Sequence, residues 1–584
     1  MNIVSVSGKN WISKEFSLDD INFFKTNFFL DEIVAKLLSI RKIKREEVTS
    51  FLEPSIRNIL PNPFILKDMD KAIDRSINAI INKEKIGIFG DYDVDGATST
   101  AILGQYFRHL KIKFEIHIPD RKSEGFGPNE KAFLEFIQKG VNLIYTVDCG
   151  TLSFKPVDFA KKKNIDVIIL DHHQSELKLP NAHSIINPNR FDDRSELNYL
   201  CAAGVCFLFL IALNKKLRDQ NWFITNGIDE PDLIKILDLV SLGTVCDVVP
   251  LIGLNRAIVR QGLKILKKKN NLGLKTLMEL NNVENNITAY HLGYILGPRI
   301  NAGGRVGKSS HGANLLLDDN AQNTFKLASE LNNYNKERQI LEAELLKKIL
   351  NTNYENNSDP VIILHGENWH EGIIGIIAAR LKEKYNKPAI IISVTSENIG
   401  KGSARSIYGF DIGTSIISGV EAGLLVKGGG HKMAAGFTID MKKINDFKEF
   451  IFKKFKSINI KLEERKNYYF DAEIAPSALN IDFFEKVNLL APFGSGNPEP
   501  RFIIKHVKLV NSKIVGEKHI KTVFVGSDST TLKGISFNSV ETNVGVHLLK
   551  KNIKSFDIAG KLSLNEWRGE RNVEFIIDDI SVIK

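Results

Sequence analysis

Residues 86–96 read IGIFGDYDVDG, and this stretch decides the fold of the chain. A short apolar run ends at Gly90, and Asp91, Asp93 and Asp95 follow it closely. Such a run is typical of a buried strand in a parallel sheet, and ligands bind beyond the carboxyl ends of such strands. Because neighbouring carboxylates repel each other, we expect a group of opposite charge beside them.

The pattern around this stretch alternates between strands and helices. KIGIFG, KFEIHIPD, NLIYTV and IDVIIL are strand-like, and segments with helical spacing, such as ATSTAILGQYFRHL, lie between them. This alternation predicts a parallel sheet with helices on both faces. A polar, uncapped helix is predicted at 324–350, and a second α/β pattern begins at VIILHG (361–366) and contains two glycine-rich loops. Short strand-like runs after APFGSGNPEP (491–500) predict a small β-barrel.

The composition bounds the class of protein. With 584 residues, of which 43% are hydrophobic, the chain is long enough for several domains. The net charge of +10 favours a polyanionic partner only slightly, because the chain is rich in Lys, Asn and Ile throughout. The four cysteines form no CxxC pair, which favours a reduced, intracellular setting. The apolar run at 201–213 is too short to span a bilayer and predicts a buried helix, and the N-terminus has no secretory signal pattern.

Acids or histidines follow three of the predicted strands. Asp148 follows NLIYTV, and Asp171, His172 and His173 follow IDVIIL, while Asp247 follows a predicted helix. Each of them alone is explained as well by a helix cap or a surface residue. Together they reach the same edge of the sheet, where carboxylates and imidazoles suit Mn²⁺ or Mg²⁺. Two such ions support phosphoester hydrolysis, so the residues predict a two-metal phosphoesterase.

Four motifs, GDYDVDGATST, VDCG, DHH and GTVCDVVPL, resemble those of the DHH phosphoesterases. GSARSIYGFDI and GGGHKMAAG resemble the associated DHHA1 domain, and PFGSGNPEPRF resembles the entry to the last domain of the RecJ single-strand-specific exonucleases. The resemblance covers nearly the whole chain, in order. It implies a mostly helical region at 1–84 packed on the DHH domain, a parallel-sheet DHH domain at 85–320, a connecting helix at 321–355, a smaller α/β DHHA1 domain at 356–460 and a nucleic-acid-binding OB-fold at 465–584.

The resemblance also implies roles for the residues at the strand ends. It implies two ions, Mn²⁺ or Mg²⁺, with Asp148 as a bridge, held by Asp93, Asp95, Asp148, His172 and Asp247. Catalytic positions are implied for Asp91, which stands where related pyrophosphatases have a histidine, for His173 beside the scissile phosphate, and for Asp171, which would orient an imidazole. Ala404 and Val94 depart from the family pattern without removing a ligand.

Glycine-rich segments with basic residues predict contacts to phosphate. Backbone N–H groups that no side chain covers can bind an anion, and an arginine guanidinium can donate two hydrogen bonds to it. Glycine permits close approach of a ligand to the backbone. The residues concerned lie in ILGPRINAGGRVG (295–307), KGSARS and VKGGGHKMAAG, and they are Arg299, Asn301, Arg305, Ser403, Arg405, Gly429, Gly430 and His431. In the predicted OB-fold, residues that would hold a single strand, or else form an ordinary lysine-rich surface with core aromatics, are Lys505, Lys508, Lys518, His519, Lys521 and Phe524.

The leading hypothesis is hydrolysis of single-stranded DNA from its 5′ end, releasing 5′-mononucleotides in DNA repair and recombination. The metal chemistry follows from the residues, whereas polarity and strand preference follow from the resemblance. Two alternatives are a phosphodiesterase for short oligonucleotides or cyclic dinucleotides, which needs no β domain, and a non-catalytic DNA-binding replication factor, which needs no intact acidic motifs. The implied partners are single-stranded DNA, a single-strand-binding protein and repair helicases. We expect a cytoplasmic monomer without membrane association.

Overall fold

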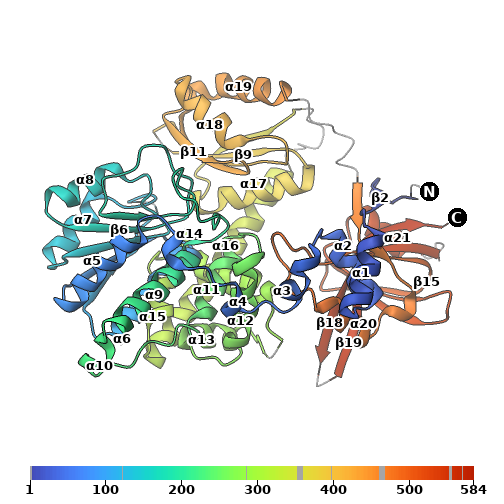
Figure 1. Ribbon diagram of the computed structural model, residues 1–584. Coiled ribbons are helices and arrows are strands. Elements are labelled where there is room, and N and C mark those ends of the chain that lie inside the picture. Colours follow the sequence, from blue (N-terminus) through green and yellow to red (C-terminus); the bar gives the residue numbers. More distant parts are fainter. Residues whose placement is uncertain are drawn as a thin grey trace. The chain divides into compact units, whose positions relative to one another are not determined.

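The computed structural model describes residues 3–121, 123–284, 286–351, 359–395, 397–458, 467–550, 555–567 and 570–583. The chain forms two compact units (Figure 1), of which the larger contains residues 61–249 and 261–460 and the smaller residues 1–60, 250–260 and 461–584. None of the helices in the described ranges is long and apolar enough to cross a membrane. The four cysteines are free thiols.

The larger unit begins with a five-stranded parallel sheet in the order β4-β3-β5-β6-β7. Its strands are β3 (Ile86–Gly90), β4 (Phe114–His117), β5 (Leu143–Val147), β6 (Asp166–Leu170) and β7 (Ser184–Ile186). The chain places β4 on one side of β3 and β5 on the other, so the strand order reverses between β3 and β5. The crevice beyond the carboxyl ends at such a reversal is where open parallel sheets bind ligands.

Helices cover both faces of this sheet. On one face, α7 (Glu130–Gln138) and α8 (Phe154–Lys162) share a core with the strands that includes Phe133, Phe136 and Val157. The helices α5 (Met69–Ile81), α6 (Val94–His109) and α9 (Ala202–Asp219) lie on the other face (Figure 1). The apolar run at 201–213 forms most of α9 and is almost entirely buried, as expected.

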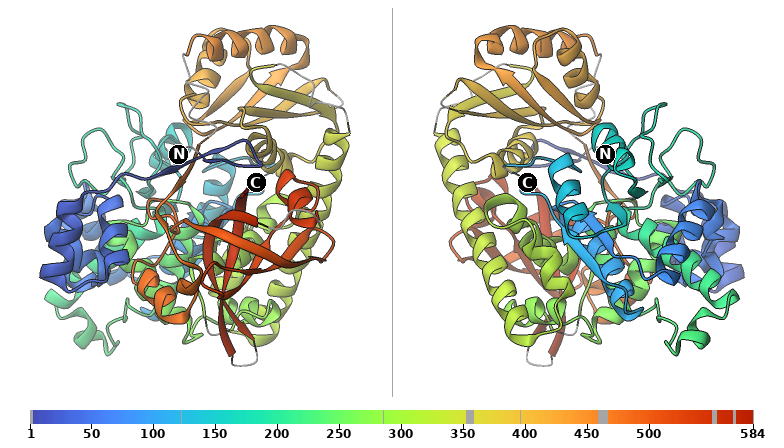
Figure 2. Two further views of the ribbon diagram at one scale, coloured as in Figure 1. Left: turned by 90° about the vertical axis from the view of Figure 1, so that its right-hand side faces the viewer. Right: turned by 90° about the vertical axis from the view of Figure 1, so that its left-hand side faces the viewer.

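A helical region follows the sheet and leads to the second α/β domain. The π-helix η3 (His291–Leu296) continues directly into α14 (Gly297–Val306), and α16 (Ala321–Leu350) then runs to the second domain (Figure 2). The predicted helix at 324–350 thus starts three residues earlier and is capped, because the Asn320 side chain accepts hydrogen bonds from the N–H groups of Gln322 and Asn323. The other helices of this region are α10 (Trp222–Asn226), α11 (Leu237–Cys246), α13 (Leu272–Leu280) and α15 (His311–Leu317). The helix α12 (Gly253–Leu266) begins among the residues of the smaller unit and ends among those of the larger.

The second domain has a five-stranded sheet in the order β11-β12-β10-β9-β8. The two glycine-rich segments predicted as loops are strands, since KGSARS lies in β10 and KGGGH forms β11. Gly402 shows the reason, because an added Cβ there would lie 2.1 Å from the ring of Phe437, so the glycine serves packing between strands. The elements are β8 (Ile362–Glu367), α17 (Glu371–Tyr385), β9 (Ala389–Val394), β10 (Ile399–Arg405), α18 (Ile412–Glu421), β11 (Lys427–His431), β12 (Ala434–Asp440) and α19 (Ile444–Lys456).

The smaller unit contains the predicted β-barrel. β15 pairs with both β16 and β18, and β17 pairs in parallel with β19, so that five strands close on themselves. The OB-like barrel is therefore confirmed. Its elements are β14 (Ala472–Glu473), α20 (Ile481–Asn488), β15 (Phe502–Val515), β16 (His519–Val525), β17 (Thr531–Ser536), α21 (Asn543–Leu549), β18 (Ser555–Trp567) and β19 (Glu570–Val582).

The N-terminal segment differs from its predicted placement. Residues 1–60 belong to the unit of the barrel, and only residues 61–84 share a unit with the DHH sheet. Phe24 and Leu38 share a core with Phe502 and Phe556 of the barrel. Helical periodicity identifies an apolar face but not the surface that this face packs against. The elements are β1 (Ile3–Val4), β2 (Asn10–Ser13), which pairs with β13 (Asn467–Phe470), and α1 (Leu18–Phe28), α2 (Glu32–Ile40), α3 (Val48–Leu52) and α4 (Ile56–Ile59).

Candidate metal centre

The acids that follow β3, β5 and β6 lie side by side at the carboxyl edge of the sheet. The backbone N–H of Asp91 donates to Val147 O, that of Asp148 to Leu170 O, and that of Asp171 to Ile186 O. Each bond continues the pairing of the strands by one residue. The parallel register of the sheet therefore carries these three carboxylates to one place.

Ligand atoms of these acids and their neighbours form three overlapping groups, in each of which the atoms lie within 4.8 Å of one another. We call two of them the Asp91 group (Asp91, Asp93, Asp148) and the Asp247 group (Asp95, His172, Asp247), and the third contains Asp148, His172 and His173. Asp148 belongs to two groups, which is the arrangement expected of a residue shared by two ions. All the residues predicted as metal ligands thus come together.

The local backbone fixes the direction of each ligand. Asp93 caps α6 by accepting a hydrogen bond from the N–H of Gly96, and Asp95 lies in the first turn of that helix. The Asp95 carboxylate accepts hydrogen bonds of 2.6 and 3.0 Å from the N–H groups of Ala202 and Ala203, at the start of α9. A helix N-terminus stabilises negative charge, so α9 holds Asp95 among the other acids.

His172 links the Asp247 group, to which it belongs, with Asp148 of the Asp91 group. Its Nε2 lies 3.3 Å from Asp148 Oδ1, 3.6 Å from Asp247 Oδ2 and 3.8 Å from Asp95 Oδ2. Asp247 reaches this position as the C-cap of α11. The end of a helix therefore brings Asp247 to the same edge of the sheet to which the strands bring the other ligands.

Burial makes the charged forms of these groups unfavourable. It raises the pKa of Asp91, Asp95 and Asp148, and neighbouring carboxylates add to the increase. Burial, together with Asp95 and Asp93, raises the pKa of Asp247 to about 9. A raised carboxyl pKa means that the folded state loses stability as pH increases from the ordinary carboxyl range towards the raised value. A bound cation would remove this cost.

The donor set fits a hard divalent cation. Asp91 Oδ1 and His172 Nε2 are buried, and neither makes a hydrogen bond to a described residue. Buried polar atoms normally have a hydrogen-bond partner, so these two atoms are suited to bind a metal ion instead. Burial raises the pKa of the neighbouring thiols of Cys149 and Cys246, which therefore stay protonated and are poor ligands. Oxygen and imidazole donors without thiolate suit Mn²⁺ or Mg²⁺.

Asp171 holds His173, as its predicted orienting role requires. His173 Nδ1 lies 2.7 Å from Asp171 Oδ1, and the N–H of Thr151 donates to Asp171 Oδ2 at 3.1 Å. Although burial acts in the opposite direction, the charge and hydrogen bond of Asp171 raise the pKa of His173 to about 9. In the metal-free protein His173 therefore carries a proton at neutral pH, and it can donate a hydrogen bond to a phosphate oxygen.

Two asparagines that the sequence analysis missed hold the histidines from behind. Asn187 Nδ2 donates to His173 O at 2.8 Å, and Asn189 Nδ2 donates to His172 O at 2.5 Å. Both come directly after β7, at the same edge of the sheet. The sequence NPN after a short apolar strand is the signal that would have identified them.

The segment 295–307 was predicted as a glycine-rich phosphate loop, and this prediction is wrong. Residues 297–306 form α14, whose backbone N–H groups lie within a helix. An added Cβ on Gly304 would lie 3.0 Å from Tyr92, and one on Gly303 would lie 2.7 Å from Lys308 O. These glycines permit close packing of the helix rather than a backbone cradle for an anion.

The side chain of Arg305 nevertheless belongs to a cationic cluster. Burial lowers the pKa of Arg305 to about 10, and Arg121, Arg338 and Arg405 add to the effect. We call these four residues the arginine cluster. Arg305 and Arg405 were predicted from the sequence, whereas Arg121, in a loop after β4, and Arg338, on α16, were not. Arg338 is paired with Glu342 at 2.7 Å, so the anion site within the cluster is assigned to the other three arginines, because cations that repel each other are suited to a bound anion.

The other predicted residues of α14 are less well placed for phosphate. The Arg299 guanidinium donates to Asn332 Oδ1 at 3.1 Å and to Ile295 O at 2.5 Å, so protein groups already engage it. Asn301 is half-buried on the same helix.

The second domain reaches the metal centre through His431. Its ring centroid lies 6.3 Å from that of His173, with the planes 21° apart. In β10, Arg405 Nη1 donates to Ser403 Oγ at 3.4 Å. A Cβ added to Gly429 would meet nothing within 4 Å, whereas one on Gly430 would lie 2.4 Å from Ala434 O, so Gly429 leaves open space and Gly430 is needed for packing.

The barrel residues predicted to hold a single strand divide into three kinds. Phe524 is 0% exposed and belongs to the barrel core, so its prediction as a platform is wrong. Lys505 and Lys521 are paired with Glu473 and Glu574. Lys508 and Lys518 are exposed, and His519 packs edge-on against Phe537, an exposed ring that sequence analysis missed, at 5.2 Å.

Replacing Gly96 by alanine should disturb the Asp91 group. The added Cβ would lie 2.4 Å from Asp91 O, a backbone atom that cannot turn aside. We expect Gly96→Ala to lower the free energy of unfolding by about 1–3 kcal/mol, measured by urea denaturation, and to weaken Mn²⁺ binding. The control is Gly204→Ala in α9, where the nearest atom is at 3.4 Å, and this variant should be as stable as the wild type or more so. Equal stability of both variants would contradict the prediction.

Comparison with known proteins assigns the chain to a family. Models of the "DHH family, N-terminal domain", the "DHHA1 domain" and the "RecJ OB domain" match residues 85–244, 358–457 and 470–579. The "Single-stranded-DNA-specific exonuclease RecJ" of Dickeya dadantii is 33% identical over 544 residues, which cover 91% of this chain and 93% of that protein. The chain belongs to the RecJ family.

Other RecJ proteins agree with this assignment. The protein of the same name from Escherichia coli is 34% identical to this chain. The matched region spans 91% of this chain and 92% of that protein. The crystal structure of RecJ in complex with Mn²⁺ from Thermus thermophilus superposes with a TM-score of 0.79 at 27% identity, covering 98% of this chain and 79% of that one. The predicted order of DHH domain, DHHA1 domain and OB-fold is therefore confirmed.

Proposed function

We propose that this protein is a metal-dependent exonuclease that hydrolyses the phosphodiester bonds of single-stranded DNA. The observation that carries the proposal is the pair of ligand groups sharing Asp148 in a chain of the RecJ family. Relatives are named as single-stranded-DNA-specific exonucleases, and a related RecJ was crystallised with Mn²⁺ and with Mg²⁺. The complete set of acids disfavours the non-catalytic alternative.

The metal ligands follow from the two groups. The Asp91 group would hold one ion and the Asp247 group a second. Asp148 would contact both ions, because it belongs to the Asp91 group and its Oδ1 lies 3.3 Å from Nε2 of His172, a member of the Asp247 group. When bound, two Mn²⁺ or Mg²⁺ ions supply an activated water and stabilise the attacking and leaving oxygens. This assignment moves Asp91 from a general catalytic position to the ligands, because its buried Oδ1 faces no hydrogen-bonding partner among the described residues.

The chain's own residues would hold the phosphate. His173, kept protonated by Asp171, would donate to an oxygen on which charge develops during the reaction. Preorganised donors of this kind stabilise a transition state more than a ground state. The arginine cluster would hold a phosphate of the strand end, and His431 would approach it from the second domain. Ser403 and Gly429 complete this proposed surface.

The finer features of the activity are part of the same proposal. Attack from the 5′ end and release of 5′-mononucleotides are supported by the resemblance, and an anion site beside the metal centre is what retention of a terminal phosphate needs. A single-strand-binding protein and repair helicases are proposed as partners on the resemblance, and a cytoplasmic location is supported by the cysteine pattern as well.

Oligonucleotides labelled at the 5′ or the 3′ end test this function. With Mn²⁺, we expect mononucleotides from the 5′ label first and little cleavage of duplex DNA. Equal attack on both ends would contradict the proposed polarity. Dinucleotides degraded as fast as long strands would instead indicate the alternative phosphodiesterase, for which the OB-fold has no use.

A further inference from the structure

Two exposed tyrosines form a stacked pair on the larger unit. Tyr290 and Tyr294 are 58% and 72% exposed, with ring centroids 5.1 Å apart and planes 23° apart. Large apolar side chains that are exposed together on a folded domain commonly mark a binding surface. The paired rings already have the parallel geometry in which a further planar group can be added.

A rigid element carries this pair. Tyr290 directly precedes the π-helix η3 and Tyr294 lies within it, while the buried Leu292 and Leu296 anchor the helix in the domain. Short π-helical segments occur frequently at functional sites. The helix continues without a break into α14, which carries Arg305 of the arginine cluster. The rings and an arginine proposed to hold phosphate are therefore joined by one continuous helical segment.

The same helix packs against the element that presents Asp247. The Cys246 thiol donates to Leu292 O at 3.4 Å, and an added Cβ on Gly297 would lie 2.4 Å from Cys246 Sγ. The next residue, Asp247, belongs to the Asp247 group. The tyrosine pair is thus fixed, through a single packed helix end, to a residue of the metal centre.

A nucleobase is the planar group that the surroundings favour. The proposed substrate carries its bases on the same chain as the phosphates that the metal centre and the arginines would hold. Aromatic faces bind bases of single strands by stacking, and they do so with little sequence preference, as an exonuclease requires. A protein partner would not need an aromatic anchor on a helix that packs against Cys246, next to Asp247, and continues into the helix that carries Arg305.

We propose that the Tyr290–Tyr294 pair is a stacking platform for a base of the strand held at the metal centre. The inference rests on the proposed function and adds a specific contact to it. The platform would position the strand and slow its release, while the hydrolysis itself remains with the metal centre. Its loss should therefore raise KM on long strands more than it lowers kcat.

Binding of 2-aminopurine oligonucleotides to the full-length protein in EDTA tests the platform without cleavage. With the fluorescent base moved along the strand, the wild type should quench it at one position near the bound end. The double variant Tyr290→Leu/Tyr294→Leu should lose this quenching and bind about tenfold more weakly, the fold-change that one stacking contact is worth. The variant Tyr290→Phe/Tyr294→Phe keeps both rings and should behave as the wild type.

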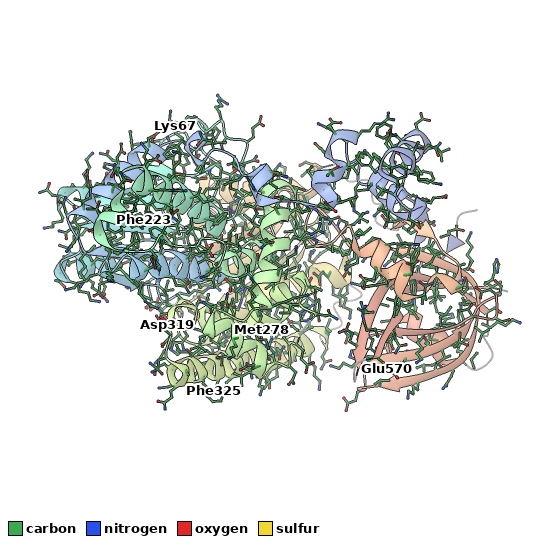
Figure 3. The ribbon with its side chains drawn as sticks, turned by 60° about the horizontal axis from the view of Figure 1, so that its bottom comes forward. Lys67, Phe223, Met278, Asp319, Phe325 and Glu570 are labelled. Carbon is green, nitrogen blue, oxygen red and sulfur yellow. The ribbon has the colours of Figure 1, made fainter. Side chains whose placement is uncertain are left out.

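The control is Phe325→Leu, which removes a 58% exposed ring from α16 (Figure 3). It should change neither quenching nor affinity. Unchanged quenching in the double leucine variant, or a loss of quenching in the phenylalanine variant as well, would overturn the platform. A defect confined to binding of a protein partner would also overturn it. If the wild type binds strands with quenching but cleaves none, the proposed function fails and the platform stands.

Discussion

The variant Asp148→Asn is expected to lose exonuclease activity by about 1,000-fold. Asp148 is the one carboxylate that belongs to both the Asp91 group and the group of His172 and His173. Metal ions contribute several kcal/mol of charge stabilisation to a transition state, and about 4 kcal/mol corresponds to this factor. The measurement is the initial rate on a 5′-labelled single strand with saturating Mn²⁺.

The same substitution should make the metal-free protein more stable. Burial and the neighbouring acids raise the pKa of Asp148, so its ionisation opposes folding at neutral pH, and an amide of the same shape removes this cost. We expect a higher melting temperature than that of the wild type in EDTA and a smaller increase on addition of Mn²⁺. The control is Asp158→Asn on the exposed side of α8, which should change neither value. A metal-free Asp148→Asn protein that is less stable than the wild type would contradict this account.

Replacing Arg405 by glutamine is expected to remove recognition of the strand end. Burial and Arg121 lower the pKa of Arg405, so its charge is poorly compensated until an anion binds. We expect kcat/KM on 5′-phosphorylated strands to fall about 100-fold, as when one preorganised donor is lost, with a smaller decrease on 5′-hydroxyl strands. The comparison of the two strands separates phosphate recognition from general damage.

The matched control for Arg405→Gln is Arg218→Gln, which changes an exposed arginine on α9. Its activity should equal that of the wild type on both strands. Equal losses on phosphorylated and hydroxyl strands in Arg405→Gln would show that Arg405 does not hold the terminal phosphate. The arginine cluster would then have a structural role only.

Sequence identified the place of the metal centre because strand topology carries several of its acids to one edge, while the resemblance supplied the ligand set. Asp91, Asp148 and Asp171 follow apolar runs, and parallel strands deliver such residues to one edge without any knowledge of packing. The order of the domains was equally accessible, since each motif is local.

Features that depend on packing could not be predicted in this way. The glycines of 297–306 look like those of a loop, and only the neighbouring Tyr92 and Lys308 show why a helix needs them. Arg121 and Arg338 lie on separate elements far apart in sequence, so no local pattern connects them. The placement of residues 1–60 and the burial of Phe524 depend on which surfaces meet in the folded chain.

The central claim is that the protein binds two ions, one in the Asp91 group and one in the Asp247 group, and that Asp148 contacts both. Anomalous diffraction from crystals grown with Mn²⁺ tests this claim most directly. We predict two manganese peaks, one contacted by Asp91, Asp93 and Asp148 and the other by Asp95, His172, Asp247 and also Asp148. A single peak, or manganese that makes no contact with Asp148, would contradict it.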